Sequence, residues 1–95
     1  MRYQPPPRDE LRRLKETLKY TNGQMAELFG IATGRQFHKY LSDEDKREMG
    51  FHVLMFGMLN LALTQGPVKD IKQLLDMARS LGAVIEPEPD GELQQ

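Results

Sequence analysis

The stretch "MGFHVLMFGMLNLAL", residues 49–63, constrains the fold most, because it holds no charged residue and almost no polar one. Its composition predicts a helix from about Gly50 to Gln65 that is apolar all round and must be covered on every side. The stretch is too short to span a bilayer, which takes about 20 apolar residues. In a chain of 95 residues, one side of this helix closes the core, and the other needs the last helix or a second subunit.

Apolar spacing and proline position predict the start of the chain. Residues 1–7 end in three prolines, which fix φ and lack an N–H, so an extended lead-in is expected. The first helix is expected over Arg8–Lys19, since Leu11, Leu14 and Leu18 recur at i, i+3 and i+7 and form one apolar stripe.

A capping box begins the second helix, expected over Asn22–Phe29. Thr21 is followed three residues later by Gln24, so the hydroxyl can accept a backbone N–H while the glutamine reaches back. Gly30 suits the left-handed position that ends a helix. Ala26 is small, as it must be where this helix crosses the next one closely.

A third, short helix is expected over Gly34–Leu41, where Thr33 and Gln36 repeat the capping-box spacing. At about 100° per residue, its aromatic residues point to the core and a basic pair lies opposite them, one turn apart. The inward anchors are Phe37 and Tyr40, and the outward residues are Arg35, Gln36, His38 and Lys39.

Residues 66–83 contain the last expected helix. Pro67 suits the first helical position and Gly82 the end. The apolar stripe between them consists of Val68, Ile71, Leu74, Leu75, Ala78 and Leu81. Residues 84–95 are expected to form an acidic flexible tail, whose first apolar residues either pack on the core or add a short strand. The chain is thus expected to be one all-α domain of five helices.

The charge is divided between the two halves. Residues 1–41 hold eight basic and four acidic residues, a net charge of +4, whereas residues 42–95 hold five basic and ten acidic residues, a net charge of −5. Such segregation suggests a polyanion-facing side, although chance alone also produces it in small proteins.

Two short helices joined by a tight turn, the second one basic outside, indicate a helix-turn-helix whose second helix fits the major groove of DNA. Arg35 can bond guanine bidentately and Gln36 can bond adenine, while Lys39 suits a phosphate. Further DNA contacts are expected from His38 and, near the helix N-termini, from Thr33, Asn22 and Gln24. The alternative for the basic pair is an ordinary solvated surface.

The segment "QMAELFGIATGRQFHKYL" resembles the helix-turn-helix of Cro/C1-type (Xre-like) bacterial and phage transcriptional regulators. Their pattern has alanine, glycine four residues later, a small turn and a helix ending in an aromatic residue; Ala26, Gly30 and Tyr40 stand at those places, with a turn one residue longer than usual. "GIATGRQFHKYLS" resembles small mobile-element repressors, including anti-CRISPR-associated regulators. The resemblance implies a lambda-repressor-like domain over residues 8–65 and a homodimer on an inverted-repeat operator, often repressing its own operon.

Dimerisation is expected through the fourth and fifth helices. The candidate interface residues are Met58, Leu59, Leu75 and Leu81.

Other classes of function find little support. The chain has no cysteine, and its two histidines lie on different expected elements without ligand spacing, so no metal and no cofactor are expected. No nucleophile–base or phosphate-loop pattern is present, so no enzymatic activity is expected. "MRYQPPPRDE" has no apolar run, which predicts a cytoplasmic protein without membrane contact. The alternative to a regulator is a protein-interaction module, antitoxin-like or a phage adaptor, on the same scaffold.

Overall fold

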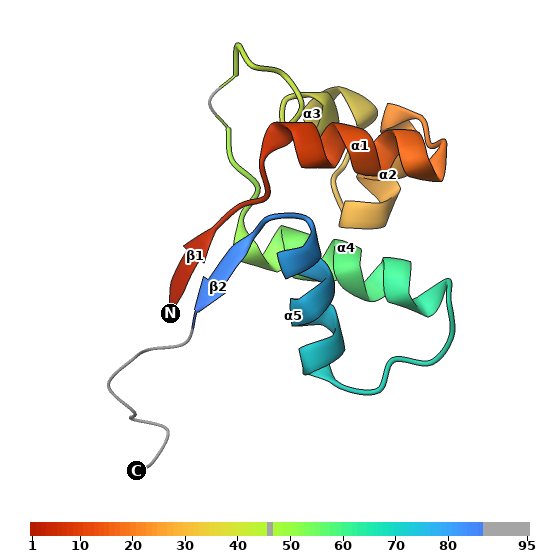
Figure 1. Cartoon of the computed structure of the whole chain (residues 1–95). Coiled ribbons are helices and arrows are strands. Elements are labelled where there is room, and N and C mark those ends of the chain that lie inside the picture. The colour runs from red at the N-terminus through yellow and green to blue at the C-terminus, as the bar shows by residue number, and fades with distance from the viewer. Residues whose placement is uncertain (46, 87–95) are drawn as a thin grey trace.

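The computed structural model describes residues 1–45 and 47–86. In that part of the chain, five helices and two short strands follow one another as β1 (Arg2–Gln4), α1 (Arg8–Leu18), α2 (Asn22–Phe29), α3 (Gly34–His38), α4 (Phe51–Leu63), α5 (Ile71–Ser80) and β2 (Val84–Glu86). Figure 1 shows α1, α2 and α3 grouped at one end of the molecule, α4 and α5 at the other, and the two strands together at one side.

The two strands form a small sheet beside the expected helices, and β2 is the short strand that was one of the alternatives left open for residues 84 and 85. β1 and β2 pair antiparallel, with Tyr3 opposite Ile85. Residues 84–86 belong to the folded domain, because they pair with β1 and the Ile85 side chain is buried in the core. The remainder of the expected tail, residues 87–95, lies outside the described residues.

Tyr3 also fastens the lead-in to the start of α4. Its hydroxyl donates to the carbonyl of Met49 at 2.7 Å, and its ring meets Phe51 edge to face, with 5.5 Å between centroids.

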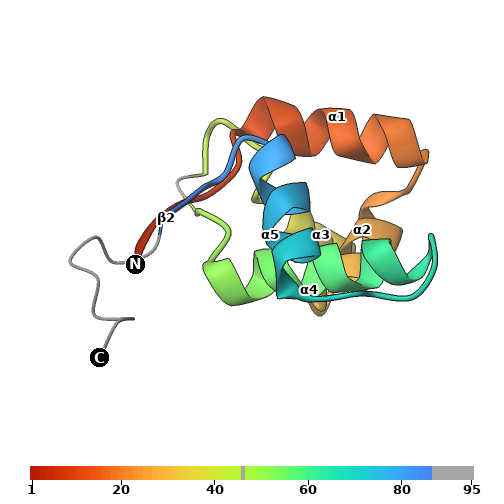
Figure 2. The same ribbon diagram turned by 60° about the horizontal axis from the view of Figure 1, so that its bottom comes forward.

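Figure 2 shows α1 along one side of the molecule and α4 along the opposite side, with α5 packed across α4. No helix in the described residues is long and apolar enough to cross a membrane.

α4 divides into a buried and an exposed side. The buried side consists of Leu54, Gly57, Met58, Leu61 and Ala62. Met58 is 0% exposed within the single chain, so the expectation that it lines a dimer interface is wrong. Phe56 and Leu63, on the opposite side, are 46% and 55% exposed.

α5 starts four residues later than expected. The carboxylate of Asp70 accepts the backbone N–H of Gln73 at 3.0 Å, and the Gln73 side chain accepts the N–H of Lys69 at 3.0 Å. This local cap places the helix start after Asp70, so Pro67 lies in the preceding loop rather than at the first helical position.

α3 is shorter than expected and ends at His38. The next three backbone N–H groups, of Lys39, Tyr40 and Leu41, bond to carbonyls three residues back, in a tighter turn than an α-helix. Tyr40 and Leu41 therefore follow α3 instead of completing it.

Candidate nucleic-acid interface

Local capping positions α2. The Thr21 hydroxyl accepts the Gln24 N–H at 3.1 Å, and the Gln24 side chain accepts the Thr21 N–H at 2.8 Å, which forms both halves of the expected capping box. Gly30 ends the helix at φ 70°, where a side chain is disfavoured. A Cβ on Gly30 would also lie 2.8 Å from the ring of Phe56, so α4 approaches this turn closely.

The first turns of α2 and α3 lie against each other. A Cβ on Gly34 would lie 2.8 Å from the backbone nitrogen of Gly23 and 3.2 Å from the Cβ of Asn22. The close approach requires glycine at the first position of α3. Both helices consequently begin on the same part of the surface, and Ala26 is buried beneath them.

One aromatic side chain sets which side of α3 faces the solvent. Phe37 is 0% exposed and stacks on Phe29 of α2, with ring centroids 5.7 Å apart and an angle of 17° between the planes. Tyr40 packs against Phe37 at 6.3 Å and is only partly buried. Arg35 and Lys39 lie on the opposite side of the helix by its geometry.

The outward side chains of α3 have no partner in the fold. Arg35, Gln36 and His38 are exposed, and Lys39 is partly buried. None of these four side chains forms a hydrogen bond or an ion pair with another residue of the ranges 1–45 and 47–86. The Thr33 hydroxyl caps the helix by accepting the Gln36 N–H at 3.1 Å, without the reciprocal bond that a full capping box has.

A groove beside α3 brings together two of the expected contact residues. It has a volume of about 490 Å³ and is lined by Arg12, Lys15, Glu16, Asn22, His38, Leu41 and Ser42. The buried Oδ1 of Asn22 has no hydrogen-bond partner among the described residues, so the fold leaves part of its bonding capacity unused. Gln24 lies elsewhere, in a hollow with Tyr20, Glu27 and Leu28.

Two basic residues of α1, Arg12 and Lys15, line the same groove, although the sequence analysis placed neither among the expected DNA contacts. Arg8, Arg12 and Lys15 recur at i, i+4 and i+7, a spacing that puts them on one stripe of α1. This spacing was the sequence signal by which these residues could have been found. Lys15 lines the groove without a side-chain partner in the described ranges, whereas the two arginines bond to the segment after α3.

Arg12 is held by two carboxylates. It donates to Asp9 at 2.8 Å and to Asp43 at 2.9 Å, and the hydrogen bond to Asp43 is the main reason that the pKa of its guanidinium is raised. Among the described residues, no cluster of three or more histidine, aspartate or glutamate side chains has the geometry of a metal site.

No family model matches the chain, and comparisons with curated proteins and with solved structures likewise found no match.

Proposed function

We propose that this chain is a sequence-specific DNA-binding transcriptional regulator that inserts α3 into the major groove of double-stranded DNA. The observation that carries the proposal is the division of α3 into a buried anchor, Phe37, and an outward side whose polar groups have no partner among the described residues. Exposed groups with unused donors and acceptors, presented on a rigid helix that begins beside α2, are what a helix-turn-helix offers to base edges.

The residue types suit the two kinds of DNA contact. Arg35 can donate two bonds to guanine, and Gln36 can exchange two with adenine, at about 1–3 kcal/mol of discrimination for each good pair. Lys39 and Lys15 present charges to phosphates, which position the protein without reading sequence. His38 and Asn22 both line the groove beside α3.

The regulator is proposed to act as a homodimeric repressor on an inverted repeat, with half-sites about 34–36 Å apart. Apolar surface on α4 supports a second subunit, because Phe56 and Leu63 stay exposed in the single chain. They take the place of Met58 in the proposed interface. Leu59, Leu75 and Leu81 are partly buried and can contribute at its edge.

Selection of random duplex DNA by the purified chain, at two salt concentrations, tests the proposal. A palindromic motif is expected for the wild type. Arg35→Ala should lose preference at one base position, whereas Lys39→Ala should weaken binding to all sequences alike and lower its salt dependence. If wild type and both variants select the same sequences with equal affinity, α3 does not read DNA.

The second candidate is a protein-interaction module. It is favoured by the same exposed apolar residues of α4, together with Ile71, which is 65% exposed at the start of α5. A chain that retains no duplex even at low salt, and that co-purifies with one stoichiometric protein, would support this function instead. Neither of these two candidate functions includes an enzymatic activity.

A further inference from the structure

The turn that follows α3 is held by arginines from α1. The carbonyls of Gln36, Phe37 and His38, at the end of α3, accept backbone N–H groups from the next turn. The carbonyls of that turn, from Lys39 on, are the ones that need other donors. Here Lys39 follows α3 in a right-handed conformation, and the chain continues without a glycine cap. Arg8 donates to the carbonyls of Lys39 and Tyr40 at 3.0 and 2.8 Å, and Arg12 donates to the carbonyl of Leu41.

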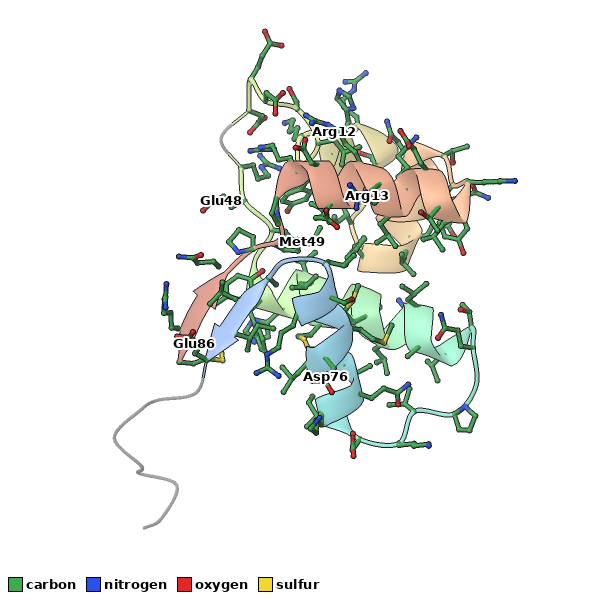
Figure 3. All side chains as sticks on the ribbon, in the orientation of Figure 1. Arg12, Arg13, Glu48, Met49, Asp76 and Glu86 are labelled. Atoms are coloured by element: carbon green, nitrogen blue, oxygen red, sulfur yellow. The ribbon has the colours of Figure 1, made fainter. Side chains whose placement is uncertain are left out.

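The same guanidinium groups hold the acidic segment that follows. Arg8 also donates to the carbonyls of Asp45 and Arg47, the latter at 2.9 Å, so one side chain bonds both to the turn after α3 and to these two later residues. Arg12 adds the ion pair with the Asp43 carboxylate. Figure 3 shows Arg12 on the side of α1 that borders this loop, and Arg13, its neighbour in sequence, on the side turned to the viewer.

The chemistry of these contacts requires arginine. A guanidinium presents five N–H donors in a rigid plane, and Arg8 directs them at four carbonyls. A lysine at the same place would keep the charge but could not reproduce the fork. The contacts also occupy both arginines, so their role differs from that of Arg35 and Lys15, whose side chains have no partner in the described ranges.

Charge gives the arrangement a consequence for DNA. Asp43, Glu44 and Asp45 follow the turn that comes after α3, the helix whose outward side is basic. Carboxylates that lay against bound DNA would repel its phosphates. The position in which these carboxylates are held therefore affects DNA binding. The turn after α3 and the positions of Asp43 and Asp45 are thus held by the same two side chains.

Resting on the proposed function, we infer that Arg8 and Arg12 are positioning residues for DNA recognition: they hold the turn that follows α3, together with Asp43 and Asp45, so that base preference depends on them although neither reads a base. Without the fork, the turn after α3 is released, and α3 changes its position in the major groove of the DNA. Because misplaced α3 side chains still carry their charges, non-specific attraction persists.

The test is Arg8→Lys, which keeps the charge and removes the fork. Binding to the selected motif and to an unrelated duplex is measured over a range of salt concentrations. The ratio of the two affinities should fall about tenfold or more, while the salt slope on the unrelated duplex stays that of the wild type. A purely structural role would lower the melting temperature and leave that ratio unchanged wherever the variant is folded.

Arg13→Lys is the matched control, because Arg13 lies on the same helix and forms only an exposed 3.5 Å ion pair with Glu10. Its affinity ratio should equal that of the wild type. If Arg8→Lys does not fold, Arg12→Lys decides, since it removes bonds to one carbonyl and the Asp43 carboxylate and leaves Arg8 in place.

The failures are distinguishable. Wild-type protein that retains no duplex overturns the proposed function, and with it this inference. Wild-type protein that selects a motif, while the folded Arg8→Lys and Arg12→Lys variants keep the full affinity ratio, overturns this inference alone.

Discussion

Gly57 of α4 lies directly against the ring of Phe29 on α2: a Cβ on this glycine would come within 2.2 Å of two ring carbons. Phe29 is 1% exposed and itself stacks on Phe37, so its ring has no free space into which it could move away from a side chain at position 57. The contact links the helix that anchors α3 to the most apolar helix of the chain.

Gly57→Ala should therefore destabilise the fold, even though alanine favours helix more than glycine does. Overpacking of a closed core costs about 1–3 kcal/mol. Denaturant unfolding followed by circular dichroism measures it. Gly23→Ala is the matched control in α2, where a Cβ would meet only the Thr21 hydroxyl at 3.8 Å; this change should stabilise by up to about 1 kcal/mol. Equal effects of the two substitutions would contradict the packing described for Phe29.

Tyr3 should be the source of a pH dependence at the alkaline end. Burial, with a smaller contribution from the Glu48 carboxylate, raises the pKa of Tyr3 from 10.0 to about 12. Since the folded state keeps the phenol protonated more strongly than the unfolded chain does, its stabilising effect is complete below pH 10 and is lost as the pH rises toward 12. The ultraviolet titration of wild type minus Tyr3→Phe should show one phenol ionising near pH 12. A difference curve centred at pH 10 would mean that the bond to Met49 does not hold the hydroxyl in solution.

Lys15 should contribute to DNA affinity without contributing to base preference. It lines the groove beside His38, and its ammonium group has no partner in the described ranges. Lys15→Gln should reduce the slope of log affinity against log salt by about 0.9, the value for one phosphate contact. Arg13→Gln removes an equal charge outside the groove lining and should leave that slope unchanged. If both variants lower the slope equally, the groove is not a preferred phosphate position.

Leu63 should be needed for self-association. Leu63→Asp places a charge on the exposed apolar side of α4, where a second subunit would otherwise cover the leucine. Light scattering at micromolar concentration should show a dimer for the wild type and a monomer for this variant. Ile71→Asp is the comparison, since Ile71 is equally apolar and 65% exposed but belongs to α5. A wild type that is monomeric, or a Leu63→Asp variant that remains dimeric, would remove α4 from the proposed interface.

Local signals predicted much of the fold and part of the site. The capping box at Thr21, the glycine end at Gly30 and the leucine stripe of α1 act through neighbours a few residues away, so the sequence was sufficient for α1 and α2. The exposure of Arg35, Gln36 and His38 followed from the same local periodicity. At α5 two local signals competed, and the side-chain cap of Asp70 prevailed over the proline at position 67.

By itself, the sequence determined α1 and α2, the polar and apolar sides of α1 and α3, and the need to cover α4. Only the tertiary structure decided which residues of α4 are buried, that Tyr3 pairs with Ile85 across 82 positions, and that Arg8 and Arg12 hold the turn after α3. The physical reason is the range of the interactions. A cap or a stripe depends on residues within one or two turns, whereas a guanidinium that satisfies carbonyls about 30 residues away depends on where the whole chain has folded.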